Sequence, residues 1–188
     1  MSKNVKILKG NGIPSEIRHL MKVALDENAL LKALNNKVKI ISYSDLKNIH
    51  DIDDLLYPHN KVIILFAIKG PLNGHWTCLF KQKNGSIQFF DSFGLLPMDE
   101  NKYMSMPYSI EKYVSDQFKP YIYELFSQYP DKIRYNQYKL QDFSTSVCGR
   151  YCVVRLQNPE LSEDEFSKEL KSTKYHPDVL VTLMTKNI

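Results

Sequence analysis

The sequence predicts an α+β domain in which helices flank a central mixed sheet of about four to five strands. Apolar residues recur at helical spacing in the first and last thirds of the 188 residues, whereas the middle third contains continuous β-branched and aromatic runs. No internal repeat or Gly/Ser linker divides the chain. We therefore expect a single domain over residues 1–188.

The first third is predicted to form short helices and one strand. Pro14-Ser15-Glu16 opens a segment of helical spacing, and a second helix should end at Asn35-Asn36. Residues 38–43 are rich in β-branched side chains and predict a strand. Ser44 or Asp45 could cap a further short helix after it.

The middle third is predicted to supply the buried strands. Residues 62–68 form the uninterrupted apolar run that is typical of a strand buried on both faces. Residues 75–82 and 87–91 flank Asn84-Gly85, which is a strong hairpin signal. We therefore expect two antiparallel strands joined by a tight turn there.

A helix and a strand are expected to follow the hairpin. Residues 107–128 have helical spacing, and Pro120 should kink or divide that helix. Residues 133–141 alternate loosely and predict another strand.

The last third is predicted to be helical. Residues 148–157 form an apolar helix, for which Ser144-Thr145-Ser146 offers capping hydroxyls. Ser162-Glu163-Asp164-Glu165 fits a capping box, and Pro177 stands where a final helix would begin.

The composition narrows the functional classes. A net charge of +4 without a dense Lys/Arg run allows contact with nucleic acid but does not demand it. No apolar run approaches the length of a membrane span, and the N-terminal stretch lacks the apolar core of a signal peptide. We therefore expect a chain that is not secreted and makes no membrane contact. Its three cysteines are too few for a disulfide framework.

Cys148 is the first candidate catalytic residue. It would lie in the first turn of a helix, where the helix dipole and unpaired backbone N–H groups favour the thiolate. Gly149 has no Cβ and would let a substrate carbonyl approach. Because free cysteines are commonly buried, packing in the core is the alternative interpretation.

A nucleophilic cysteine needs a base, and the base needs an orienting group. Among the five histidines, His75 is singled out because it opens a predicted strand directly after a loop. Asp91 lies across the predicted hairpin among aromatic residues, where an unpaired carboxylate would be costly to bury. The alternative is that Asp91 only caps a turn and that His75 only begins a strand.

The hairpin register tests this pairing. With a two-residue loop, facing residue numbers would sum to 169, and His75 and Asp91 would point to opposite faces. With a three-residue loop and a left-handed Gly85, the sum becomes 168 and Asp91 lies opposite Thr77, on the face of His75. The apolar pattern favours the first register, but the pairing needs the second. We therefore predict a longer loop or a bulge.

Gln141 is the fourth candidate. It lies seven residues before Cys148, at the end of a predicted strand. Its amide could join the Cys148 backbone N–H in stabilising an oxyanion. The alternative is an ordinary surface glutamine.

In their order and spacing along the chain, these residues resemble the catalytic motifs of the adenovirus-type cysteine proteases. The resemblance covers roughly residues 60–157, and the ubiquitin-like-protein (SUMO) proteases of the same clan are similar in the same places. Its motifs are Gly74-His75-Trp76, Phe90-Asp91-Ser92-Phe93-Gly94, Gln141, and Cys148-Gly149-Arg150-Tyr151-Cys152. The size is also similar to that of the capsid maturation proteases of virophages and polinton-like elements.

The resemblance implies a papain-like (adenain-like) fold and a cysteine endopeptidase. Cys148 would be the nucleophile at the start of a buried helix, His75 the base and acid, and Asp91 its orienting group. Gln141 would supply the oxyanion hole. Trp76 would pack beside the histidine, and Trp76 and Gly149 would contact the substrate. The implied substrates are viral structural and capsid precursors, cut near Gly-Gly sites in the virion or in the virus factory of the host cytoplasm.

Other readings stay open. The alternatives are a ubiquitin-like-protein deconjugating protease and a non-catalytic binding module on the same scaffold. An acyltransferase is a third.

We expect no metal and no cofactor. The adenoviral enzyme is activated by a disulfide-linked peptide and by DNA, but no cysteine lies between Cys78 and Cys148 to take such a peptide. A weak DNA contact is left open, and Cys152 is expected to pack in the core.

Overall fold

The computed structural model describes residues 12–67, 74–95 and 121–188. Within these ranges the strands form one mixed sheet in the order β1-β2-β3-β4-β5. The strands are β1 (Lys39–Ser42), β2 (Lys61–Ala67), β3 (Gly74–Lys81), β4 (Ile87–Phe90) and β5 (Ile133–Tyr135). The two outer pairs are parallel and the two inner pairs antiparallel. The predicted mixed sheet is confirmed.

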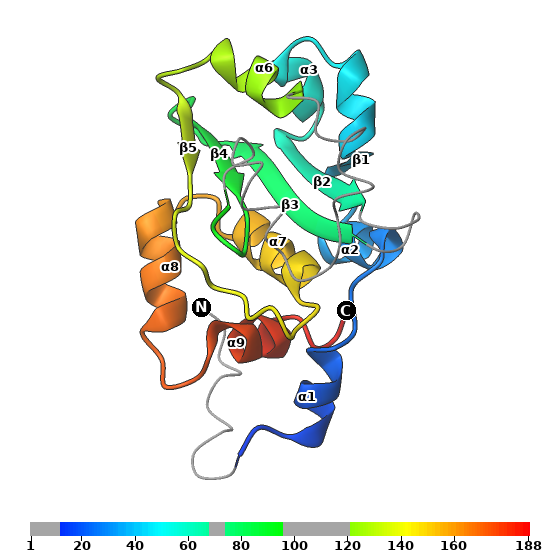
Figure 1. Cartoon of the computed structure of the whole chain (residues 1–188), viewed down its shortest axis with the longest axis vertical. Helices are drawn as coiled ribbons and strands as arrows, with labels where there is room; N and C mark the ends of the chain where they lie inside the picture. The colour runs from blue at the N-terminus through cyan, green and yellow to red at the C-terminus, as the bar shows by residue number, and fades with distance from the viewer. Residues whose placement is uncertain (1–11, 68–73, 96–120) are drawn as a thin grey trace.

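Helices cover both faces of this sheet, as Figure 1 shows, so the predicted α+β class is also confirmed. Helix α7 (Cys148–Gln157) packs against β3 on one face. The 3₁₀ helix η2 (Tyr43–Asn48), α3 (Ile52–Leu56) and α6 (Tyr121–Ser127) pack on the other. The remaining described helices are α1 (Ser15–Leu20), α2 (Glu27–Ala33), α8 (Glu163–Lys171) and α9 (Pro177–Met184). Among the described helices, α3 is the one that the sequence did not predict.

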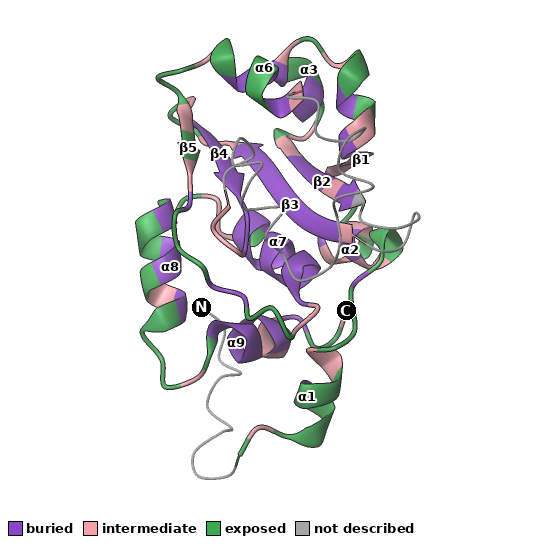
Figure 2. Cartoon of the chain, viewed as in Figure 1, coloured by how far each residue is buried: buried purple, intermediate pink, exposed green. Residues whose placement is uncertain are grey.

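The core has two apolar clusters, one on each face of the sheet. Trp76, Cys78 and Phe80 of β3 point toward α7, whereas Leu79 points toward α3 and α6. Figure 2 shows that the central strands and α7 are mostly buried, whereas α1 and α8 expose their outer sides. Burial of apolar surface on both faces of β3 is the main driving force that fixes α7 on the sheet.

The β3–β4 register is the one that brings His75 and Asp91 to the same face. Cys78 pairs with Phe90 and Lys81 with Ile87, so the facing numbers sum to 168. Gly85 is left-handed with φ of +83°, and the Ser86 carbonyl accepts the Gln82 N–H to close the turn. The predicted longer loop is confirmed. The register favoured by the apolar pattern is wrong. Because β4 is buried on both faces, the alternation of its side chains between the two faces does not indicate the register.

Most helix boundaries follow the predicted signals. Asn35 and Asn36 take positive φ angles where α2 ends. Ser162 and Glu165 form the capping box of α8, and Pro177 is the first residue of α9. Helix α6 is described over Tyr121–Ser127, whereas Pro120 and the earlier part of the predicted helix 107–128 lie outside the described residues. Within the described segments, no helix is both long and apolar enough to cross a membrane.

Two local predictions are wrong. Helix α7 begins at Cys148 as predicted, but Val147 occupies its N-cap, and within the described chain no hydroxyl from 144–146 caps it. The Thr145 hydroxyl instead contacts Asp178. The predicted strand 133–141 ends at Tyr135, because the side chain of Asn136 takes over the hydrogen bonding to the neighbouring backbone.

Candidate active site

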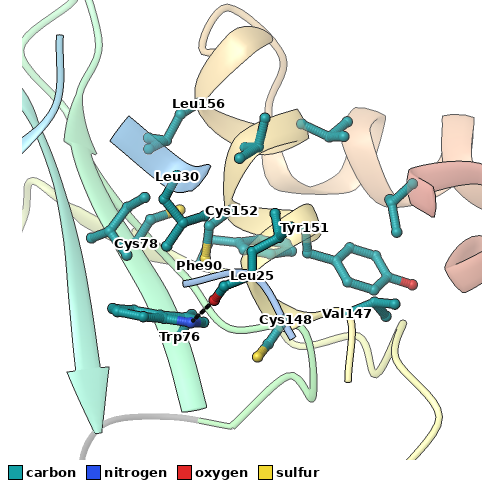
Figure 3. Close-up of a cluster of buried hydrophobic side chains, with 14 of the residues drawn as sticks. Leu25, Leu30, Trp76, Cys78, Phe90, Val147, Cys148, Tyr151, Cys152 and Leu156 are labelled. Atoms are coloured by element: carbon teal, nitrogen blue, oxygen red, sulfur yellow. Dashed lines mark hydrogen bonds between the residues drawn. The ribbon is translucent and has the colours of Figure 1, made fainter. Parts of the chain in front are cut away.

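Cys148 lies at the N-terminal end of α7, where the helix meets strand β3. Figure 3 shows it at the edge of the apolar cluster, with Trp76 nearby. The residue is only 6% exposed. Because no side chain caps this end of α7 among the described residues, the helix dipole and free backbone N–H groups act on the sulfur directly.

His75 is the second residue of β3 and lies between the acid and the thiol. Its Nε2 is 3.1 Å from Oδ1 of Asp91, and both side chains are buried. An ionised carboxylate only accepts hydrogen bonds, so Nε2 donates to Asp91. Nδ1 then remains for the hydrogen bond with Cys148. The ring that stacks on the imidazole, 4.8 Å away, is that of Phe93.

Asp91 follows β4 directly and is fully buried. Its Oδ1 also accepts the Phe93 N–H at 2.7 Å, so it caps the turn as well as contacting His75. Asn136 holds its backbone from both sides, accepting the Asp91 N–H at 2.9 Å and donating to the Asp91 carbonyl at 2.6 Å. The two interpretations of Asp91 from sequence are therefore compatible.

The electrostatics of the three residues favour an ion pair. Burial alone would lower the pKa of His75, but the charge and hydrogen bond of Asp91, with a contribution from Cys148, raise that pKa to about 10. Burial alone would raise the pKa of Cys148. The hydrogen bond and charge of His75, with the backbone N–H groups of Trp76 and Gly149, lower it instead. The geometry therefore favours a thiolate beside an imidazolium.

Gln141 is buried, so the interpretation as a surface glutamine is wrong. The Ser92 hydroxyl donates to its Oε1 at 2.6 Å, and its Nε2 donates to the Thr145 carbonyl at 3.0 Å. These two contacts fix which end of the amide is the donor. The Ser92 carbonyl also accepts the backbone N–H groups of Leu140 and Gln141, both at 2.9 Å. The turn that carries Asp91 is thus tied directly to the segment that carries Gln141.

Gly94 lies where the turn after Asp91 packs against the backbone of residues 138 and 139. It is left-handed with φ of +69°, and a Cβ there would lie 2.7 Å from the Tyr138 carbonyl carbon and 2.9 Å from the Lys139 nitrogen. Only glycine therefore lets the two segments approach this closely.

Trp76 and Gly149 pack against each other on the α7 side of β3. The indole Nε1 of Trp76 donates to the Leu25 carbonyl at 3.0 Å, drawn as the dashed line in Figure 3. A Cβ on Gly149 would lie 3.2 Å from Trp76 and 3.3 Å from both Leu25 and Leu30. Gly149 is therefore explained by packing, without a substrate, and Phe93 rather than Trp76 stacks on the imidazole.

The other two cysteines lie in the core. Cys78 and Cys152 are fully buried free thiols, and burial, with the neighbouring Cys78, raises the pKa of Cys152 well above its usual value. The predicted core packing of Cys152 is confirmed. No group of three metal-binding side chains occurs in the part of the chain that the structure describes.

A cavity of about 490 Å³ opens elsewhere, between the β3–β4 turn, the segment after β5 and the start of α8. None of the four candidate residues, His75, Asp91, Gln141 and Cys148, lines it, so hydrogen bonding and charge, rather than cavity size, mark the candidate site.

Sequence reasoning missed the residues that hold the four candidates in place. Ser92 and Phe93 belong to the motif around Asp91, and their position next to the acid was a usable signal. Asn136 and Asp178 carried no signal, since their partners are remote in sequence. Asp178 accepts hydrogen bonds from the Asp142 N–H, the Thr145 hydroxyl and the Tyr151 hydroxyl, and so fixes the segment that precedes α7.

Comparisons with known proteins were made for the sequence and for the fold. No protein-family model matches the chain. Among solved structures, ChlaDub1 from Chlamydia trachomatis has a TM-score of 0.46 at 13% identity, covering 88% of this chain and 90% of that one. The ASFV pS273R protease has a TM-score of 0.44 at 15% identity, covering 86% of this chain and 66% of that one.

A curated sequence gives a much stronger match. "Uncharacterized protein V9" of the Sputnik virophage is 38% identical over 176 residues, covering 90% of this chain and 98% of that protein. Similarity of this extent over nearly the full length of both chains shows common descent. The chain belongs to the family of virophage protein V9.

Proposed function

We propose that this protein is a cysteine peptidase with Cys148 as nucleophile, His75 as general base and acid, and Asp91 as the group that orients His75. The observation that carries the proposal is the buried hydrogen-bonded series from Asp91 through His75 to Cys148. A buried carboxylate that contacts an imidazole, which in turn contacts a thiol at a helix N-terminus, is the arrangement that activates a cysteine.

In the first half-reaction, the Cys148 thiolate attacks the carbonyl carbon of the scissile bond and forms a tetrahedral oxyanion. The C–N bond then breaks, and the leaving amine takes the proton from Nδ1 of His75. The product is an acyl-enzyme with a thioester at Cys148. Asp91 holds the imidazole through Nε2 during this step and stabilises its positive charge.

In the second half-reaction, His75 accepts a proton from water, and the resulting hydroxide attacks the thioester carbonyl. Collapse of the second oxyanion releases the carboxylate product and restores the Cys148–His75 pair. Gln141 is proposed as an oxyanion donor, because its Nε2 is fixed as a donor beside the segment that leads into α7.

The proposed biological role is the maturation of virions by cleavage of capsid and other structural precursors near Gly-rich sites. Two observations support a viral role: the family includes a virophage protein, and the motifs resemble those of the adenovirus-type proteases. The protein would act in the virion and in the host cytoplasm, with protein substrates and without a metal or cofactor.

The experiment is a cleavage screen with purified protein. One panel holds fluorogenic peptides with Gly-Gly before the scissile bond and virion structural proteins with Gly-rich segments; the other holds conjugates of ubiquitin and SUMO. We expect cleavage in the first panel that is abolished in both Cys148→Ala and His75→Ala. Cleavage confined to the second panel would identify a deconjugating protease instead. Cleavage in neither panel would favour a binding module.

A further inference from the structure

A series of stacked rings leads from His75 to the protein surface. Phe93 stacks on the imidazole with ring centroids 4.8 Å apart, and Phe143 stacks on Phe93 at 4.9 Å. Phe143 is 52% exposed, which is unusual for a phenylalanine. The ammonium of Lys139 lies 3.4 Å from the centroid of the Phe143 ring. We call His75, Phe93 and Phe143 the aromatic series.

The end of this series is held in a fixed position. Phe143 lies within the segment 142–145, whose two ends are both bound to Asp178 through the Asp142 N–H and the Thr145 hydroxyl. Asp142 also accepts the Ser144 N–H at 2.7 Å. An apolar ring kept exposed on an anchored turn presents a preformed contact surface.

The chemistry places a definite part of a substrate beside this surface. The leaving amine must reach Nδ1 of His75, so the residues after the scissile bond pass next to the imidazole. The Phe143 centroid lies within about 10 Å of the imidazole along the series. Because an extended peptide advances about 3.3 Å per residue, Phe143 is within reach of the second and third residues after the scissile bond.

We infer that Phe143 forms a substrate subsite that binds a large apolar side chain at the second or third position after the scissile bond. The inference rests on the proposed peptidase function and adds the leaving-group side of the substrate to it. The occupant is apolar because the exposed part of the site is a phenyl ring, which buries an aliphatic or aromatic side chain favourably. Lys139 does not block the site, since an exposed cation–π contact is weak and a lysine side chain is readily displaced.

The test compares three substrates that share Gly-Gly before the scissile bond. The first carries aminomethylcoumarin as its leaving group, so no residue follows the bond. The other two are internally quenched peptides with either Leu or Ser at the second and third positions after it. Wild type, Phe143→Ala, Phe143→Tyr and Tyr123→Ala are compared. Tyr123 is a matched control because it is an aromatic residue, 50% exposed, on α6.

We expect Phe143→Ala to lower kcat/KM for the Leu peptide about tenfold, the usual effect of losing one apolar contact. It should leave the coumarin substrate and the Ser peptide within about twofold of wild type. Phe143→Tyr should retain the preference for Leu, and Tyr123→Ala should change nothing.

Two results would overturn the inference while leaving the peptidase proposal intact. Equal losses on all three substrates would mean that Phe143 acts through Phe93 and His75 and does not touch substrate. No loss on the Leu peptide would mean that the ring makes no substrate contact. If wild type hydrolyses none of the three, the proposed peptidase function itself fails, and that outcome is separate because it is read before any variant is compared.

Discussion

Gly94→Ala and Gly85→Ala form a matched pair that tests how the site is held together. Both glycines are left-handed, with φ of +69° and +83°, so an alanine at either position costs about 1–2 kcal/mol of stability from backbone strain alone. The surroundings differ. A Cβ at Gly85 would meet nothing within 4 Å, whereas one at Gly94 would lie 2.7 Å from the Tyr138 carbonyl carbon.

This contact falls about half an ångström or more short of normal van der Waals separation, and the obstructing atoms are backbone. Relief requires the segment 138–141 to move away from the turn that carries Asp91. Overpacking of this kind adds about 1–3 kcal/mol. We therefore expect Gly94→Ala to lose about 2–5 kcal/mol and Gly85→Ala about 1–2 kcal/mol.

The two variants should also differ in activity. Movement of the segment 138–141 displaces Gln141, the proposed oxyanion donor, and misplacement of such a group by about 1 Å can cost about 100-fold in rate. We expect kcat to fall about tenfold or more in Gly94→Ala and to remain unchanged in Gly85→Ala. Urea unfolding and peptide hydrolysis measure both effects. Equal stability losses, or equal activities, would show that the close approach at Gly94 does not position Gln141.

Two further predictions concern the charges of Cys148 and His75 and the proposed oxyanion donor, Gln141. In Cys148→Ala, the raised pKa of His75 stabilises the fold fully below pH 6.5. Stability should then fall by about 1.4 kcal/mol per pH unit as pH rises from 6.5 toward the pKa of His75 in the folded variant. Asp91 still raises that pKa, but it lies below the wild-type value of about 10 because the contribution of Cys148 is lost. In wild type, urea unfolding should be nearly independent of pH from about 6.5 to 8.5, because the native thiol has lost the proton that His75 has gained; equal slopes in the two proteins would contradict the ion pair. Ser92→Ala should lower kcat about tenfold without changing KM, because the Gln141 amide loses the hydrogen bond that orients it. Asn84→Ala, at an exposed position in the β3–β4 turn, is the control. An unchanged kcat in Ser92→Ala would show that this hydrogen bond does not orient Gln141 for catalysis.

The sequence predicted the position of Cys148 and its helix well, because an apolar helix and the polar loop before it are local features. The hydroxyl cap expected for this helix is absent, since Val147 occupies the N-cap. It also predicted that the register must bring His75 to the face of Asp91, because side chains alternate strictly along a strand. The apolar pattern misled because β3 and β4 are buried on both faces, so either register would place apolar side chains in a core.

The support of the site was out of reach of sequence reasoning. Asn136 holds the backbone of Asp91 from 45 positions away, and Asp178 holds the segment before α7 from a different helix. Hydrogen bonds between remote segments leave no periodicity or spacing in the chain. The absence of a Cβ at Gly149 suggested space for a substrate. In the structure, Trp76, Leu25 and Leu30 occupy that space, and these residues are also remote from Gly149 in sequence.

The most direct test of the central claim is the pH dependence of Cys148 alkylation by iodoacetamide, followed by mass spectrometry from pH 5 to 9 in wild type and in His75→Ala. Cys78 and Cys152 are fully buried and serve as internal controls that should not react in the folded protein. We expect rapid labelling of Cys148 at pH 6 in wild type and a loss of at least about tenfold in His75→Ala, because a free thiol with a pKa near 8.5 holds little thiolate there. Labelling that rises only near pH 8.5, and equally in both proteins, would contradict the activated Cys148–His75 pair.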